Sequence, residues 1–141
     1  MIPDTNYSAL IIRLSLGTIL LAHGLLKLLV FTLPGTIGYF ESLGLPPIAA
    51  YLTVFGEIVG GTALLLGIYA RLTALCTVPL LFGAVWVHST NGWLFSSPGG
   101  GWEFPLLLVT MAGAVAVQGA GPFSLKSIPM IDTVLPSFLR A

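Results

Sequence analysis

The sequence predicts an all-α integral membrane protein, a four-helix transmembrane bundle formed by one domain of 141 residues. Hydrophobic residues make up 56% of the chain and charged residues only 7%, against about 25% in an ordinary soluble domain. The mean hydropathy is +1.01. Four apolar stretches approach the roughly 20 residues that a spanning helix needs. Helices are expected because lipid offers the backbone no hydrogen-bond partners, and the stretches lack the alternation of barrel strands.

The charge and cysteine content excludes several classes of protein. Five basic and five acidic side chains cancel, so the chain has no basic face for nucleic acid. The single cysteine, Cys76, excludes a disulfide scaffold and a CxxC redox motif. The partner that the composition does predict is a lipid bilayer.

The expected spans are separated by segments rich in glycine and proline. The first is expected to be a retained helix ended by Pro34 and Gly35, because its apolar part is too long for a signal peptide and no cleavage site follows it. Gly44-Leu45-Pro46-Pro47 precedes the second span, and the turn around Ala70 separates the second from the third. The four spans cover approximately residues 9–33, 48–70, 72–88 and 104–119.

The distribution of Lys and Arg predicts the orientation. With four spans, both termini and the turn between the second and third spans lie on one side. That side carries Arg13, Arg71, Lys126 and Arg140, whereas the other has only Lys27. Positive charge favours the cytoplasm, so both termini are expected to be cytoplasmic. Arg13 and Arg71 are expected to extend toward lipid phosphates.

Residues 120–141 form the expected cytoplasmic tail. Its apolar residues recur at helical spacing, which is compatible with a short helix lying at the membrane interface. Pro136 argues instead for a loosely packed tail, and both readings stay open. The apolar residues are Met130, Ile131, Val134, Leu135, Phe138 and Leu139.

Ionisable residues occur inside or beside the apolar stretches, where they are costly and usually face the bundle interior. Apart from Arg13 and Arg71, the topology places five of them in the outer half of the membrane or at its outer edge, on four different spans. We expect these five to converge on one polar pocket under the 89–102 loop. Lys27 could pair with either of the two carboxylates. The candidate catalytic residues are His23, Lys27, Glu57, His88 and Glu103.

Three interpretations of this cluster are open. It could be a functional pocket, with Tyr39, Asn91 and Trp102 as candidate ligand-binding residues. It could be a structural network that holds the helices in register, with the aromatic residues in an ordinary interfacial belt. It could hold zinc or iron, but HxxxH and ExxH spacings are absent and Lys27 would repel a cation, so we predict no metal site.

Taken together, these residues resemble the DoxX family of small integral membrane proteins, which includes DoxD-like relatives. Lys126 departs from the family pattern, which has an acidic residue there. The matching fragments run in order from about residue 10: Arg13, Gly17, His23-Gly24, Lys27, Leu45-Pro46, Glu57-x-x-Gly60-Gly61, Gly67, Arg71, His88, Asn91-Gly92-Trp93, Gly100-Gly101-Trp102-Glu103-Phe104-Pro105, Gly119-x-Gly121 and Ser124-Leu125.

The resemblance implies a four-helix bundle in the inner, cytoplasmic membrane of a bacterium or archaeon, and an oxidoreductase-associated activity linked to quinone. A quinone needs hydrogen-bond donors and a proton path, which His23, Lys27, His88 and the carboxylates could provide. The chain shows no dinucleotide fingerprint and no cysteine cluster, so electrons would come from a redox partner subunit or a reactive substrate. The alternatives are a non-catalytic assembly partner and a small-molecule carrier, each compatible with a homo-oligomer.

Overall fold

The computed structural model describes residues 6–125 and 129–140, and the regular structure in those ranges is helical, without strands. The main helices are α1 (Tyr7–Leu25), α2 (Leu33–Ser42), α3 (Pro47–Leu66), α4 (Ala70–His88) and α5 (Glu103–Gln118). A π-helix, Leu26–Val30, continues α1, and a 3-10 turn, Ser89–Asn91, follows α4. The tail contains α6 (Pro129–Asp132) and a 3-10 turn, Ser137–Leu139.

Three helical segments are long and apolar enough to cross a membrane, which confirms the all-α membrane class. They are Tyr7–Val30, Pro47–Leu66 and Ala70–Asn91, with 24, 20 and 22 residues. The fourth, α5, has only 16 residues. At 1.5 Å per residue it is about 24 Å long, against about 30 Å of hydrocarbon. Its crossing of the membrane stays a prediction.

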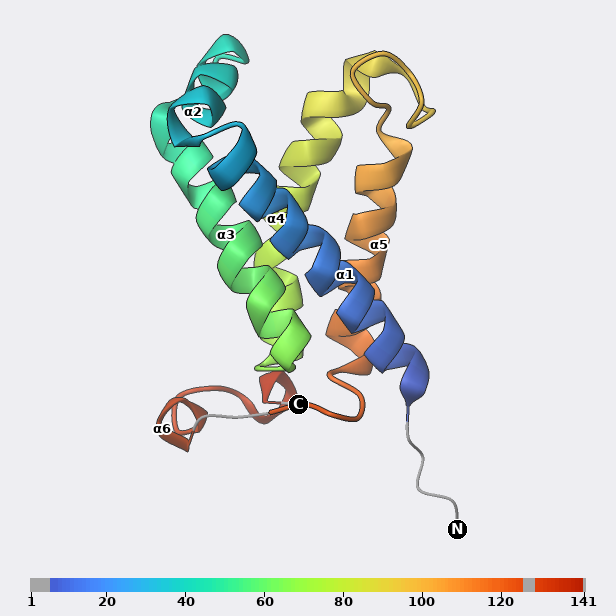
Figure 1. The fold of residues 1–141 in the computed structure, drawn as a ribbon. Coiled ribbons are helices and arrows are strands. Elements are labelled where there is room, and N and C mark those ends of the chain that lie inside the picture. The colour runs from blue at the N-terminus through green and yellow to red at the C-terminus, as the bar shows by residue number, and fades with distance from the viewer. Residues whose placement is uncertain (1–5, 126–128, 141) are drawn as a thin grey trace.

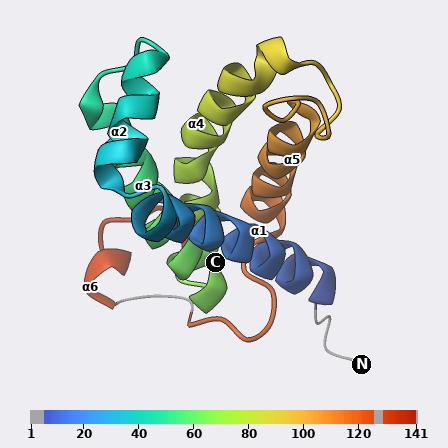
Figure 2. The same cartoon turned by 45° about the horizontal axis from the view of Figure 1, so that its top comes forward.

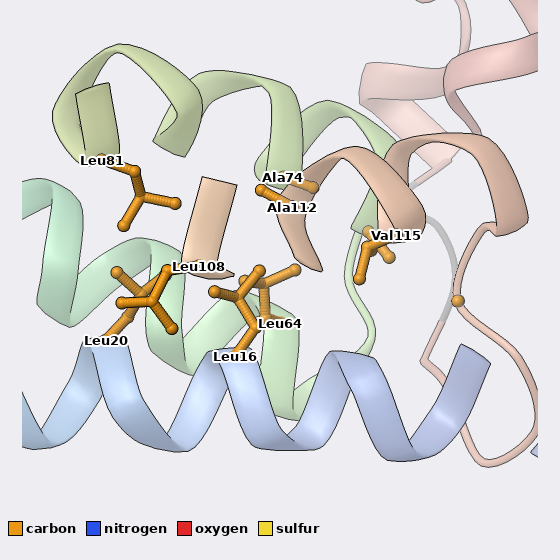
Figure 3. Packing of buried hydrophobic residues seen from close by; sticks show 10 residues of the cluster. Leu16, Leu20, Leu64, Ala74, Leu81, Leu108, Ala112 and Val115 are labelled. Carbon is orange, nitrogen blue, oxygen red and sulfur yellow. The ribbon is translucent and has the colours of Figure 1, made fainter. Parts of the chain in front are cut away.

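The helices form two closely packed pairs, α1 with α3 and α4 with α5, and α1 also contacts α5 (Figures 1 and 2). We call the end with α2 and the 92–102 loop the upper end, and the end with the α3–α4 turn and α6 the lower end (Figure 1). Apolar side chains from all four long helices meet between the pairs (Figure 3). This core contains Leu16, Leu20, Leu64, Ala74, Leu81, Leu108, Ala112 and Val115.

Glycines allow α1 and α3 to approach at backbone contact. A Cβ atom added to Gly61 would lie 2.6 Å from the Leu21 amide nitrogen and 2.9 Å from the Gly17 carbonyl oxygen. A Cβ on Gly24 would lie 3.0 Å from the Glu57 Cβ. Neighbouring backbone cannot move aside as a side chain can, so the crossing requires small residues at these positions.

The guanidinium of Arg13 joins three segments at the lower end, which corrects the expectation that it extends to lipid. The residue is 0% exposed. Nε donates to the Ala120 carbonyl (2.7 Å), and Nη1 donates to the Leu64 (2.6 Å) and Leu65 (2.9 Å) carbonyls. Nη2 donates to the carbonyls of Pro122 (3.2 Å) and Phe123 (3.0 Å).

These acceptors explain why the side chain turns inward. Leu64 and Leu65 are in the last turn of α3, whose carbonyls lack partners within the helix and carry the negative end of its dipole. Arg71 turns inward as well, with Nη1 donating to the Ala116 carbonyl at 3.2 Å near the end of α5. The expectation for Arg71 was therefore also wrong.

The segment after the first span forms a helix that the sequence analysis did not predict. Pro34 and Gly35 were expected to end the first span, but they lie in the first turn of α2. Proline is tolerated there because that turn has no partner for its N–H. Thr32 is the N-cap, with φ of 63° and a side chain that accepts from the Gly35 amide. The apolar segment therefore ends at Val30 rather than near residue 33.

The tail does not form one continuous amphipathic helix. α6 covers only Pro129–Asp132, and Pro136 separates it from the 3-10 turn that follows. The Tyr69 hydroxyl donates to Asp132 Oδ1 at 2.8 Å, which fixes α6 against the α3–α4 turn. Lys126 lies outside the described residues.

Gly61→Ala is expected to destabilise the protein because the new methyl group would meet the backbone of α1. Overpacking of this kind costs about 1–3 kcal/mol. Gly113→Ala in α5 is the matched control, because an added Cβ there meets nothing within 4 Å. Thermal unfolding in detergent should show a lower Tm for the first variant only. Equal Tm values would contradict the close crossing.

Arg13→Lys is expected to lower stability although it keeps the charge. A lysine has three N–H donors instead of five, so at least two buried carbonyls lose a charged donor, each worth about 1.5–3 kcal/mol. Arg140→Lys is the control, because Arg140 is exposed and the bonds that its side chain makes to the described residues go to the Leu135 carbonyl. A Tm unchanged in both variants would show that Arg13 does not hold the lower end together.

Candidate functional site

Lys27 and Glu57 form an ion pair inside the membrane-spanning part of the bundle. Lys27 Nζ lies 2.7 Å from Glu57 Oε1 and 2.9 Å from Oε2. The side chains are 20% and 7% exposed. The sequence left open whether Lys27 pairs with Glu57 or Glu103, and the structure selects Glu57. This is the ion pair found among residues 6–125 and 129–140.

The π-helix determines where Lys27 is placed. Its wider turn is closed by the Phe31 amide, which donates to the Leu26 carbonyl at 3.1 Å. Well under 1% of residues adopt this conformation, and it is frequent at functional sites. Buried Thr36 supports the turn, because its hydroxyl lies 3.1 Å from the Lys27 carbonyl and 3.0 Å from the Thr32 carbonyl. The sequence analysis missed Thr36. The only feature of the sequence that could have revealed it is its position, one helical turn after Thr32, where Thr32-x-Pro34 is compatible with the start of a helix.

A cavity of 280 Å³ opens beside the ion pair at the upper end, where α4 diverges from α2 and α3 (Figure 1). We call it the α2–α4 cavity. Apart from the ion pair, its walls are mainly apolar and aromatic. They include Tyr39, Phe40, Thr53, Leu80, Gly83 and Trp86.

A second hollow of 510 Å³ lies along α2, and it shares Lys27, Tyr39 and Phe40 with the α2–α4 cavity. The two rings, 6.3 Å apart and edge to face, therefore separate two spaces that both reach the lysine. Tyr39 was expected near the site and is found there. Phe40, its neighbour in the sequence, was not predicted.

The electrostatics of the site suit a neutral ligand with a hydrogen-bond acceptor. The ammonium and the carboxylate cancel in net charge. Lys27 has three N–H donors, two of which serve Glu57. The third has no acceptor among the residues that the structure describes. In low-dielectric surroundings, a donor of this kind binds a carbonyl oxygen strongly.

His23 is close in sequence to the ion pair but does not line the cavity. It lies on α1, where its side chain is exposed. Nδ1 lies 2.8 Å from the Ile19 carbonyl and is therefore the protonated nitrogen in the neutral ring.

The remaining predicted residues lie in or beside the 92–102 loop and contact it, and they do not line the cavity. His88 Nδ1 lies 3.1 Å and 3.0 Å from the Gly99 and Gly100 carbonyls, to which the Asn91 side-chain amide also donates (3.0 and 2.9 Å). These contacts fix the loop to the upper end of α4.

The other side of the loop is fixed to α5. Glu103 Oε1 accepts from the Phe95 amide at 2.7 Å, and the rings of Trp93 and Trp102 meet edge to face at 4.5 Å. The loop thus closes over the α4–α5 pair and not over the Lys27–Glu57 pair, so the five candidate residues do not converge on one pocket. The physical reason is that α3 and α4 diverge at this end. Among the described residues, no group of three or more His, Cys, Asp or Glu side chains could hold a metal ion.

Long apolar helices with a buried ion pair between two of them define a small helical membrane protein. The chain belongs to the DoxX family, whose model matches residues 8–90. The matched region contains both members of the ion pair and His88.

A protein of Bacillus subtilis (strain 168) named "Putative oxidoreductase CatD" is 34% identical to the chain over 76 residues. The match covers 54% of this chain and 55% of that protein, so the chain spans about half the length of the relative it matches. No solved structure matches the chain.

Lys27→Met alone is expected to destabilise the protein, because it leaves the buried Glu57 carboxylate without a partner. Breaking one side of a buried pair costs about 3–5 kcal/mol. The double variant with Glu57→Met should recover most of this loss, since a hydrophobic pair of similar volume replaces both charges. Tm values of the wild type, both single variants and the double variant measure the coupling. Additive losses would contradict it.

Proposed function

We propose that this chain is an oxidoreductase-associated membrane subunit that binds a quinone, or a small substrate of similar chemistry, in the α2–α4 cavity. The observation that carries the proposal is the Lys27 ammonium at the wall of an apolar, aromatic cavity, where one of its N–H groups has no acceptor among the residues that the structure describes. A quinone is an apolar ring with carbonyl oxygens. It would accept from Lys27 and pack its ring against the Tyr39, Phe40 and Trp86 side chains.

The size of the cavity supports this class of ligand. Small-molecule sites usually occupy about 300–1,000 Å³. The α2–α4 cavity and the neighbouring hollow along α2, at 280 and 510 Å³, fall near and inside this range. They share Lys27, so a ligand longer than one ring could contact both spaces. Both also adjoin spans that face lipid, where a lipid-soluble substrate is dissolved.

The residues of the site support the movement of protons but not of electrons. Reduction of a quinone takes two electrons and two protons. Lys27 and Glu57 form a donor–acceptor pair that can pass a proton to a ligand oxygen. The electrons must come from elsewhere, because one cysteine cannot form a dithiol–disulfide couple within the chain. We therefore propose a redox partner subunit, or a directly reactive substrate, as the source.

The charges of the described residues support the predicted orientation. Arg13, Arg71 and Arg140 belong to the lower end or the tail, whereas Lys27 is the basic residue of the upper half. By the positive-inside rule, the lower end faces the cytoplasm. We propose an inner-membrane location with both termini cytoplasmic and the ion pair in the outer half of the bilayer.

A second candidate function, a non-catalytic assembly partner, is favoured by His23. The residue lies within the span Tyr7–Val30, and its side chain is exposed. Polar side chains within membranes are normally covered by protein. On the same helix, a hollow of 410 Å³ is lined by Leu14, Ser15, Thr18 and Ile19. Ser and Thr favour close helix approach, so a helix of a partner or of a second copy could cover this face.

Gly83→Leu is expected to weaken quinone binding without unfolding the protein. Gly83 lines the α2–α4 cavity, and an added Cβ there meets nothing within 4 Å. A leucine side chain would therefore fill the ligand space instead of displacing neighbouring atoms. Binding of decylubiquinone to the detergent-solubilised protein, followed by quenching of tryptophan fluorescence, should weaken about tenfold or more, which corresponds to about 1.4 kcal/mol.

Gly113→Leu is the matched control, because Gly113 is equally uncrowded but lies on α5, outside the cavity lining. It should bind like the wild type. Equal weakening in both variants would place the ligand elsewhere. A wild-type protein that does not bind the quinone would favour the assembly-partner function.

A further inference from the structure

We propose that a second cavity, formed by the 92–102 loop and the first turns of α5, binds the ammonium headgroup of a zwitterionic membrane lipid. This cavity has a volume of 480 Å³ and is distinct from the α2–α4 cavity, with which it shares no lining residue. Its wall combines one carboxylate, Glu103, with three aromatic side chains, Trp93, Phe95 and Phe104. The proposal is independent of the quinone site.

Glu103 supplies an anionic charge that the protein does not neutralise. Its Oε1 accepts a hydrogen bond from the Phe95 amide, a neutral donor. Over the described ranges, the ion pair found joins Lys27 to Glu57, and no basic side chain reaches Glu103. The residue begins α5, and the partial positive charge there, roughly half an elementary charge, stabilises the carboxylate without cancelling it.

The aromatic side chains favour a cation beside this carboxylate. The face of an aromatic ring attracts ammonium groups, by about 0.5–2 kcal/mol per contact depending on exposure. The edge-to-face contact with Trp102 and the hydrogen bond from the Phe95 amide to Glu103 fix the loop that carries two of these rings. A carboxylate flanked by fixed aromatic rings is the chemistry that recognises primary and quaternary amines.

The net charge of the upper end excludes an anionic headgroup. Its charged side chains are Lys27, Glu41, Glu57 and Glu103. Lys27 is paired with Glu57. Glu41 and Glu103 therefore remain as two uncompensated carboxylates. A phosphatidylglycerol headgroup would be repelled here, whereas a zwitterionic lipid presents its ammonium group outermost.

The apolar part of the cavity points to a lipid rather than a free amine. Leu106, Leu107 and Thr110 continue the lining along α5, one to two turns beyond Glu103. Leu107 is 53% exposed, and four residues of helix place it about 6 Å along the axis from Glu103. This matches a headgroup held at the carboxylate with its acyl chain lying along α5.

The test compares the lipids that the protein retains when it is released from nanodiscs into a native mass spectrometer. The nanodiscs contain equal amounts of phosphatidylethanolamine and phosphatidylglycerol. We expect the wild type to retain phosphatidylethanolamine preferentially and Glu103→Gln to reduce that retention about tenfold. Glutamine keeps an oxygen acceptor for the Phe95 amide and removes only the charge, so the loop stays closed.

Glu41→Gln is the matched control. Glu41 is an exposed carboxylate of α2, at the same end of the bundle, and it does not line the cavity. It should retain phosphatidylethanolamine like the wild type. Tm measurements of both variants separate loss of the fold from loss of the lipid.

Three outcomes would overturn the proposal. The first is preferential retention of phosphatidylglycerol by the wild type. The second is unchanged phosphatidylethanolamine retention in a folded Glu103→Gln variant. The third is displacement of the lipid by free ethanolamine at low concentration, which would support recognition of the ammonium but overturn its source as a membrane lipid.

Discussion

Backbone carbonyls at helix ends are a problem for any chain surrounded by lipid, because no water is present to donate to them. In this protein the Arg13 side chain donates to such carbonyls of two segments at once. Its guanidinium donates to the last turn of α3 and to the chain that follows α5, from a position on α1. The charge needs no carboxylate, since carbonyl dipoles surround it. Because α1, α3 and α5 are fixed together here, the remaining architecture is arranged relative to this lower end.

The fixed lower end determines how the helices are arranged at the upper end. From Arg13, α1 and α3 cross in backbone contact at Gly17 and Gly61, and the crossing continues to Gly24 beside Glu57. One turn further, the π-helix brings Lys27 to the same carboxylate. On the other side of α3, α4 diverges, which leaves the α2–α4 cavity beside the pair. The polar site is thus placed where a tightly packed pair of helices and a diverging pair meet.

The sequence predicted the helical class, three apolar spans and the inward-facing Lys27 and Glu57, because hydropathy and the cost of buried charge act locally along the chain. It did not predict Arg13, since an arginine near a span end looks the same whether it reaches phosphates or carbonyls of distant segments. It also missed α2, because Pro34-Gly35 is compatible with a helix end and a helix start. The prediction that His88 and Glu103 converge on Lys27 was wrong for a different reason. Depth in the membrane follows from topology, but the angle between helices depends on side-chain packing that one sequence does not reveal.

The π-helix between Leu26 and Val30 has a consequence for how this chain can vary. A π turn contains one residue more than the α-helical path it replaces, and the wider turn absorbs that residue. Loss of a single residue within it would restore a regular helix and leave the segments on either side in nearly the same phase. The change would be confined to the turn itself, where the Lys27 carbonyl accepts from the Thr36 hydroxyl. A change of length by one residue here should therefore alter the surroundings of Lys27 while the contacts near Arg13 stay intact.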